Sequence, residues 1–426
     1  MYKTYHPKVG IIGGGLAGLS AAWRLRTYAS DVDVVVLEKA RRLGGRIETH
    51  RTFGADHGAH YFLHSEGHFW KLIHQLGLDD QVILAADQTQ VFAIGRRCRA
   101  IGWRLHEVVA RLFEDAPKTV RALRVVFRDV ERASFGAETS GVSTFAQWLA
   151  RKLGGDRRAH AFIRTILKGD LCAPHSHVSA EVGAVCLKSL LSNKETWYSL
   201  RGGLATLVSR LEKGIRRAGV RVITEWQARE VRPEGSRLRV AGAQRGQSLS
   251  FTFDAVIVAS PLDGRLRVAG SFPRRCYHAY TSVLFRVPES ADRLLRSALK
   301  AGGLYTDLPL NYVSSEGGRV YRVLVPDSKS LSLRSAHSAV AKCRRSLSRL
   351  VPGIERELRA LRTGDWSVRH WTIGLPCSRP SRGVARASGI FWAGDWVADY
   401  PSMDGAVESG FEAAMQVHDF LSGKAP

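Results

Sequence analysis

The chain has 426 residues, of which 45% are hydrophobic, and carries a formal net charge of +24. This length can bury a sizeable core and favours two domains of roughly 200 residues each, while no apolar run reaches the ~18 residues that a membrane-spanning helix requires. Because no apolar signal segment precedes the first predicted strand, we expect a cytoplasmic protein.

The excess of basic residues, 63 Lys and Arg against 39 Asp and Glu, is spread along the chain in short pairs. Dispersed charge without a recognisable binding motif argues against a nucleic-acid partner. Two interpretations stay open. The charge favours peripheral association with an anionic membrane surface, or it reflects a basic composition with no specific partner.

The first predicted elements are a strand, residues 9–12, and a helix, residues 16–26, joined by a glycine-rich turn. Gly13 permits the tight turn, Gly15 lets a pyrophosphate approach the backbone, and Gly18 allows the helix to pack closely on the strand. Phosphates would bind at the positive end of the helix, so the turn predicts a dinucleotide site. The predicted phosphate site comprises Gly13, Gly15, Leu16, Ala17 and Gly18.

A second apolar run, residues 32–37, ends at Glu38. A carboxylate there can accept both ribose hydroxyls of an adenosine and would repel a 2′-phosphate, so NADP is disfavoured. Gly44, Gly45 and Arg46 follow, and an NAD dehydrogenase has no need of them. FAD is longer, so a second loop that offers two amides and a guanidinium to its pyrophosphate favours FAD. Lys39 and Arg42 complete the candidate residues of this segment.

The rest of the chain alternates helical and strand signals. A helix is expected near residues 69–76, a helical stretch over 103–191, strands at 220–223, 254–259, 280–287 and 320–325, and a closing helix near Met403. The periodic apolar positions of residues 103–191 are typical of packed helices. We interpret that stretch as a cap over the substrate and residues 274–371 as a substrate-domain sheet.

Three segments carry a family resemblance. The opening motifs up to Arg46 are followed by Asp56-His-Gly-Ala-His-Tyr-Phe62, and the chain closes with Phe391-Trp-Ala-Gly-Asp-Trp396 and Ser402-Met-Asp-Gly-Ala406. Together they resemble the FAD-dependent amine oxidase superfamily, which includes amine oxidases, protoporphyrinogen oxidases, phytoene desaturases and squalene-associated desaturases. In motif they are most similar to the phytoene and squalene-associated desaturases. The resemblance implies an α/β fold, in which a Rossmann-type, GR2-like FAD-binding domain carries an inserted α+β substrate domain.

The resemblance also implies where the cofactor binds. It adds Gly58, Ala59, His60, Tyr61, Ala228, Gly394, Asp395, Ser402, Met403 and Ala406 to the candidate FAD-binding residues. His60 and Tyr61 are expected at the isoalloxazine face, and the flavin carries the chemistry without a nucleophile or triad. The expected FAD-binding domain comprises residues 1–86, 201–272 and 385–426, and the substrate domain residues 87–200 and 273–384.

Two further features are interpreted conservatively. His57, His60, His64 and His68 are close in sequence, but no matching Cys or carboxylate signature accompanies them, so we predict no metal site. Cys377 lies shortly before the closing motif, where some amine oxidases carry a cysteine bonded to the flavin. With a single uncertain motif to support a covalent bond, the prediction is non-covalent FAD.

The substrate class depends on Ser402. Amine oxidases resemble one another in an aromatic cage with one member at this position, and the serine favours instead a dehydrogenase or desaturase acting on an apolar, isoprenoid-like or polycyclic small molecule. Two alternatives stay open: an amine or amino-acid oxidase that releases hydrogen peroxide, and a non-catalytic flavoprotein that binds an anionic partner through its basic surface. The electron acceptor, oxygen or a quinone, is left open.

Overall fold

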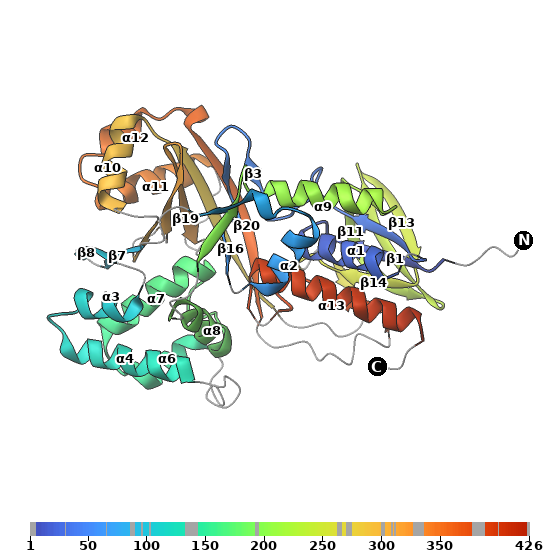
Figure 1. The fold of residues 1–426 in the computed structure, drawn as a ribbon, viewed down its shortest axis with the longest axis horizontal. Coiled ribbons are helices and arrows are strands. Elements are labelled where there is room, and N and C mark those ends of the chain that lie inside the picture. Colours follow the sequence, from blue (N-terminus) through green and yellow to red (C-terminus); the bar gives the residue numbers. More distant parts are fainter. Residues whose placement is uncertain are drawn as a thin grey trace, which may run out of the picture.

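The protein consists of two lobes that lie side by side along its long axis (Figure 1). The computed structural model describes residues 6–29, 31–64, 66–85, 90–94, 97–101, 104–132, 144–191, 196–261, 266–269, 275–299, 303–307, 310, 312–326, 336–376, 388–398 and 400–423. Segments from the beginning, middle and end of the chain meet in one lobe, and the segments between them build the other.

A five-stranded parallel sheet forms the centre of the first lobe, in the order β10-β2-β1-β14-β21. The strands are β1 (Lys8–Ile12), β2 (Asp33–Leu37), β10 (Arg221–Ile223), β14 (Ala255–Val258) and β21 (Ile390–Trp392). Their continuous apolar runs are typical of strands that are covered on both faces. Since β10, β14 and β21 lie far from β1 in sequence, the sheet is complete only when three separate stretches of chain meet.

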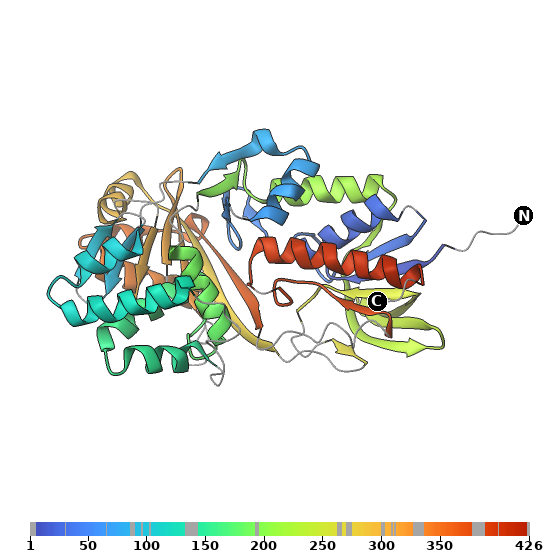
Figure 2. The same ribbon diagram turned by 60° about the horizontal axis from the view of Figure 1, so that its bottom comes forward.

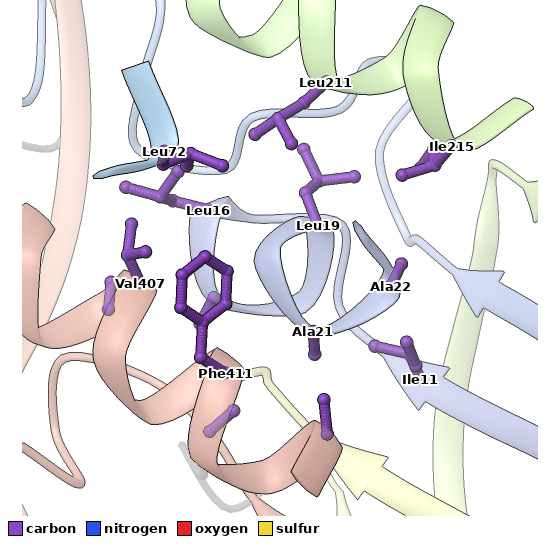
Figure 3. Close-up of a cluster of buried hydrophobic side chains, with 14 of the residues drawn as sticks. Ile11, Leu16, Leu19, Ala21, Ala22, Leu72, Leu211, Ile215, Val407 and Phe411 are labelled. Atoms are coloured by element: carbon purple, nitrogen blue, oxygen red, sulfur yellow. The ribbon is translucent and has the colours of Figure 1, made fainter. Parts of the chain in front are cut away.

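Helices cover one face of this sheet. They are α1 (Leu16–Tyr28), α2 (Gly67–Gln75), α9 (Ala205–Arg217) and α13 (Met403–Leu421). Figure 3 shows Leu16 and Leu19 of α1 among Leu211 of α9 and Phe411 of α13. Complete burial of one such leucine stabilises the fold by about 1.5–3 kcal/mol.

An antiparallel meander covers the opposite face. It comprises β11 (Trp226–Glu234), β12 (Arg237–Gln244) and β13 (Gln247–Phe253), with β15 (Arg267–Val268) at its edge. Trp226, Val231 and Val240 are buried in a cluster with Ile12 and Val258 of the parallel sheet. The parallel strands are therefore shielded from water on both sides.

The second lobe is built on a seven-stranded sheet in the order β20-β16-β19-β18-β17-β7-β8. The strands are β7 (Gln90–Ile94), β8 (Arg97–Ile101), β16 (Arg275–Arg286), β17 (Gly303–Thr306), β18 (Tyr312–Gly317), β19 (Val320–Pro326) and β20 (Trp366–Pro376). The long strands β16 and β20 reach toward the beginning of α13, so this sheet extends to the first lobe (Figure 2).

Two helical layers enclose the seven-stranded sheet. One contains α3 (Leu105–Leu112), α4 (Pro117–Arg132), α6 (Phe145–Leu153), α7 (Arg157–Leu171) and α8 (Ala180–Leu191), and the other contains α10 (Glu289–Leu299), α11 (Ala336–Leu350) and α12 (Glu355–Ala360). Alternate residues of β19 divide between the layers. Leu324 packs against the first layer, and Val323 and Val325 pack against the second. This period of two is typical of a strand with two covered faces.

Short elements join the lobes. They are β3 (Thr49–His50), β4 (Ala55–Asp56), β5 (Phe62–Leu63), β6 (Val82–Leu84) and β9 (Trp197–Leu200), with a single turn at Asp79–Gln81. A second single turn, Thr363–Asp365, connects α12 to β20 within the second lobe. Strand β9 pairs with both β5 and β6, so the chain returning from the helical layer is tied to the segment after β4.

The predicted fold class is confirmed: the first lobe contains a parallel sheet covered on both faces, and the second lobe, called the substrate lobe below, is α+β. The helical stretch over residues 103–191 contains α3, α4, α6, α7 and α8 among its described residues, and the meander β11–β13 was not predicted. The proposed domain limits remain a prediction. Within the described part of the chain, every helix is too short or too polar to span a bilayer.

Candidate functional site

The glycine-rich turn between β1 and α1 forms an open anion site. Gly13 has φ +110°, and a Cβ on it would lie 2.9 Å from the carbonyl oxygen of Ala259, so glycine is required. A Cβ on Gly18 would collide with the Gly13 carbonyl. Helix α1 starts at Leu16, and Gly15 at its N-cap offers no side chain to its free amides. The first amides of a helix lack intrahelical partners and carry the positive end of the dipole, so they can bind phosphate oxygens.

Glu38 is held in place at the carboxyl end of β2. Its two carboxylate oxygens accept hydrogen bonds from the amides of Gly14, at 2.7 Å, and Ala40, at 2.8 Å. Only 7% of the residue is exposed. Each oxygen retains a lone pair, so the carboxylate can also accept ribose hydroxyls. Lys39 is exposed beside it.

The second predicted loop lies directly against the first. The Gly44 amide donates to the carbonyl of Gly14 at 2.8 Å, and a Cβ on Gly45 would lie 3.1 Å from the Cα of Gly15. Arg42 shapes the loop, because its guanidinium donates to the carbonyls of residues 43, 45 and 47 and to Glu48. Its guanidinium is therefore committed to the protein's own acceptors.

Arg46 and Asp395 bring the two ends of the chain together. Sequence reasoning assigned each of them to the cofactor separately, and the structure pairs them at 2.6 Å. Asp395 is only 6% exposed, and the Arg46 side chain 31%. Burial opposes the charge of Arg46, but Asp395 and Tyr280 outweigh it and raise the pKa of the guanidinium. The pair can fix the second loop against the closing segment.

The closing segment, residues 391–406, contains the N-terminus of α13. The Gly394 amide donates to Ser409 Oγ at 2.9 Å, and Ser402 Oγ caps the helix by accepting the Gly405 amide at 3.0 Å. Ser402 therefore acts as an N-cap, which stabilises a helix start. Met403 and Ala406 are buried in the first turn. Its amides and dipole can stabilise negative charge placed there.

His60 and Tyr61 lie between the second loop and the substrate lobe. Gly58 approaches the Arg46 carbonyl so closely that a Cβ would collide with it, and the Gly58 carbonyl contacts His60 Nδ1 at 3.0 Å. Burial, followed by the charge of Arg322, lowers the pKa of His60 well below its usual value, so its imidazole is neutral. The Tyr61 ring lies 4.2 Å from the His60 ring.

Sequence reasoning missed Arg322, which belongs to β19 and is fully buried. It donates to the carbonyl of Asp56 at 3.1 Å and to Glu316 Oε1 at 2.6 Å, and its guanidinium carbon lies 5.5 Å from the centre of the Tyr61 ring. Asp56 in turn accepts the Leu204 amide at 3.1 Å. The available signal was a charged residue inside an otherwise apolar strand. Glu316 lies only six residues away, but the contact with Asp56 could not be predicted because Asp56 is far away in sequence.

A small cavity lies in the second lobe, between its first helical layer and the seven-stranded sheet. It is lined by Gln90, Phe92, Leu105, Ile166, Leu190, Trp197 and Tyr305. Phe92 and Tyr305 stack at 5.1 Å, and Trp197 lies 5.4 Å from Tyr61. Aromatic rings thus connect the cavity to the segment that carries His60. Its volume of about 30 Å³ is far below the ~300–1,000 Å³ of a ligand pocket, so it marks an apolar gap in the packing near Tyr61.

The remaining predicted residues have other surroundings. His57 contacts the hydroxyls of Ser282 at 3.4 Å and Ser367 at 2.9 Å, and His68 lies 3.6 Å from Asp404. No group of three metal-ligating side chains occurs among the described residues. Ala228 is half-buried at a bulge of β11. Cys377 lies outside the described residues.

Comparisons with known proteins identify the family. The family described as flavin containing amine oxidoreductase matches residues 16–418, so the chain belongs to it. The predicted superfamily and the predicted cofactor, FAD, are confirmed.

Individual relatives are more distant. Coproporphyrinogen III oxidase of Mycobacterium tuberculosis is 23% identical over 293 residues, which cover 64% of this chain and 63% of that protein. Polyamine oxidase 3 of Oryza sativa subsp. japonica is 32% identical over 134 residues, which cover 29% of this chain and 27% of that protein. The structure of cyclohexylamine oxidase from Brevibacterium oxydans has a TM-score of 0.74 at 17% identity and covers 98% of this chain and 100% of that one, which shows a shared fold.

The described residues fit FAD. The uncapped start of α1 offers amides to a pyrophosphate, and Glu38 holds a carboxylate ready for the adenosine ribose. Gly45 lets the second loop pack closely against Gly15 at this site. The first turn of α13 would face the flavin end. Each of these features belongs to the chain itself and does not depend on any one relative.

Proposed function

We propose that this oxidoreductase dehydrogenates an apolar, isoprenoid-like or polycyclic substrate. Bound FAD supplies the hydride acceptor. The observation that carries the proposal is Ser402, which caps α13 where an aromatic ring would favour an amine. The mainly aliphatic and aromatic lining of the small cavity near Trp197 agrees with an apolar substrate. The chain's own residues would exclude water and orient the substrate next to the helical layer and the seven-stranded sheet.

Ser402 supports the same substrate class. Its hydroxyl caps α13, so at this position the chain offers a hydrogen bond to its own backbone in place of an aromatic ring. A ring would stack on a substrate and stabilise a cationic nitrogen nearby, and a serine does neither. An apolar substrate loses nothing by its absence.

Amine oxidation is the second candidate. It is favoured by the similarity to a polyamine oxidase and by Asp170, a carboxyl group that is hydrogen-bonded to the cavity-lining residue Tyr305 at 2.6 Å. A cationic nitrogen in the cavity could be stabilised by aromatic rings and a nearby carboxylate. The third alternative, a non-catalytic flavoprotein, is disfavoured by membership of an oxidoreductase family.

Anaerobic flavin bleaching tests the proposal. The purified flavoprotein is mixed with coproporphyrinogen III, phytoene or cyclohexylamine without oxygen, and the loss of flavin absorbance is followed. Rapid bleaching by the porphyrinogen or phytoene is expected. Bleaching by the amine alone would overturn the proposal in favour of an amine oxidase. Subsequent addition of oxygen or a quinone then identifies the electron acceptor.

A further inference from the structure

Asp170 is a deeply buried carboxyl group without a basic partner. It lies at the end of α7, where Tyr305 Oη donates to its Oδ1 at 2.6 Å and Cys186 Sγ to its Oδ2 at 3.7 Å. Among the described residues it forms no salt bridge, and only Tyr305 and Cys186 offset its burial. A buried carboxylate without a cation is costly, so its presence calls for a functional explanation.

The hydrogen bonds of Asp170 lead in two directions. In one direction they lead to Tyr305, which lines the cavity. Ile166 also lines it, and this residue lies one helical turn before Asp170 on the same face of α7. Toward the cofactor lobe they lead through Cys186 to Tyr400, whose hydroxyl bonds to the Cys186 sulfur. Tyr400 stands two residues before the N-cap of α13. A continuous chain of polar groups therefore runs from the cavity to the closing segment.

We propose that Asp170 is the proton acceptor of the oxidation and that Tyr305 relays the proton to it from a substrate bound next to the cavity that Tyr305 lines. The inference rests on the proposed function, an oxidation that removes hydride from carbon. A substrate C–H bond would give its hydrogen and electron pair as hydride to bound FAD. An N–H or C–H bond adjacent to that carbon, or conjugated with it, would release a proton, and its electron pair would form the new double bond. Tyr305 Oη takes that proton while its own proton passes to Asp170 Oδ1. The hydroxyl is regenerated, and the carboxylate becomes a carboxylic acid.

The surroundings of Asp170 suit a base near neutral pH. Burial raises the pKa of Asp170 to about 6 against the hydrogen bonds from Tyr305 and Cys186. The other titratable groups that face it are Cys172, Tyr312 and Tyr400. Burial raises the pKa of all five partner groups, so they are neutral where Asp170 titrates. No charged group of α4, α6 or β7, which also pack against α7, acts on Asp170 among the described residues.

A second tyrosine–aspartate pair in the same lobe, Tyr321 and Asp292, has a structural role and allows a comparison. Tyr321 donates to Asp292 Oδ1 at 2.7 Å, nearly the geometry of Tyr305 and Asp170. However, Arg296 contacts the Asp292 carboxylate at 2.8 Å. Burial opposes the charge of Asp292, but the bonds from Arg296 and Tyr321 outweigh it and lower its pKa. Asp292 is thus a carboxylate with its own cation, and it serves as a control.

Infrared spectroscopy tests the relay without turnover. In the purified flavoprotein, titration between about pH 4 and 8 should reveal a protonated-carboxyl C=O band that appears as the pH falls through about 6 and is absent from Asp170→Asn. Asp292→Asn should retain it. A band that titrates near the ordinary value for aspartate, about 4, would overturn the proposal.

Kinetics test the role in the reaction. The rate of anaerobic flavin bleaching by coproporphyrinogen III in the wild-type protein should fall about tenfold per pH unit below pH 6, because protonated Asp170 accepts no proton. Asp170→Asn and Tyr305→Phe should each be about 100-fold slower or more, and Asp170→Asn should lose this pH dependence. Asp292→Asn should behave like the wild type. Tyr305→Phe keeps the test intact if Asp170→Asn fails to fold.

The outcomes separate the two proposals. Wild-type bleaching with an unchanged rate and pH profile in both Asp170→Asn and Tyr305→Phe would overturn the relay and leave the proposed function standing. A wild-type flavin that coproporphyrinogen III and phytoene both fail to reduce would overturn the proposed function, and with it the relay.

Discussion

At the scale of single residues, we expect the Glu38 carboxylate to strengthen the binding of FAD. The carboxylate is oriented by two amides before any ligand arrives, so little ordering remains to oppose binding. Glu38→Gln keeps the shape but replaces one acceptor oxygen with a donor and removes the charge. Because hydrogen bonds to charged groups contribute about 1.5–3 kcal/mol, we expect the FAD dissociation constant to rise at least about tenfold, as measured by titration of FAD-free protein.

The control for this variant is Glu225→Gln. Glu225 lies near the same edge of the parallel sheet, where it pairs with Arg41 at 2.8 Å and Arg245 at 2.9 Å. Its carboxylate has partners on the protein surface, so its loss should leave FAD affinity unchanged. Equal affinities for FAD in the wild type and Glu38→Gln would show that the ribose is bound elsewhere.

The Arg46–Asp395 pair predicts coupled effects on stability. Removing Arg46 leaves the buried Asp395 carboxylate without its cation, whereas removing both leaves no uncompensated charge. Because Arg46 is partly exposed to solvent, we expect Arg46→Ala to lower the free energy of unfolding by about 1–3 kcal/mol in urea titrations of the FAD-free protein. The double variant Arg46→Ala/Asp395→Ala should lose less than the sum of the two single variants. Strictly additive losses would show that the two side chains do not interact.

Local motifs made part of the site predictable. The glycine turn, Glu38 and the Gly44-Gly45 loop all lie within residues 13–45, so their spacing in one short stretch of sequence carries the information. The pairing of Arg46 with Asp395, the reach of Arg322 to Asp56 and the contact between Tyr305 and Asp170 depend on the tertiary fold. Short-range sequence spacing cannot predict these pairs, because the partners lie more than a hundred residues apart in the chain.

At the scale of elements, the close packing of α1 on α13 requires a glycine at position 410. A Cβ there would collide with the carbonyl oxygen of Ala17, in the first turn of α1. Gly410→Ala should therefore push the helices apart, lower the free energy of unfolding by about 1–3 kcal/mol and weaken FAD binding, because the phosphate-binding amides move with α1. Urea unfolding and FAD titration measure both effects. Gly364→Ala, where nothing lies within 4 Å of the new methyl group, should change neither.

Elements differ in how well the sequence predicts them. The strands β1, β2 and β14 are continuous apolar runs, which identify parallel strands covered on both faces. The meander β11–β13 was missed because its strands interleave apolar residues with arginines and glutamates, as in Trp226–Glu234. Its alternation appears only once Trp226 and Val231 are seen to face the parallel sheet. A pattern with one solvated face is harder to recognise than an unbroken apolar run.

At the scale of the whole molecule, helix α4 carries a row of exposed basic residues. Helix α4 lies at the outer end of the substrate lobe, remote from the parallel sheet (Figure 1). Its exposed basic residues are Lys118, Arg121, Arg124, Arg128 and Arg132. Over the residues that the structure describes, none of them forms a salt bridge, whereas Asp129 and Glu131 of the same helix pair with Lys152 and His106. This row supports the proposed association with an anionic membrane surface.

Charge reversal on α4 tests that association. Since each basic residue near an anionic surface contributes about 1 kcal/mol, the triple variant Arg121→Glu/Arg124→Glu/Arg128→Glu should bind vesicles containing phosphatidylserine at least about 100-fold more weakly than the wild type in sedimentation assays at low salt. Binding by the wild type should also weaken as salt is raised, because surface charges are screened. The matched control reverses three exposed residues of α9 in the other lobe, Arg210, Lys213 and Arg217, with the same change in net charge. Equal losses in the two triple variants would show that net charge, and not the α4 surface, draws the protein to the membrane.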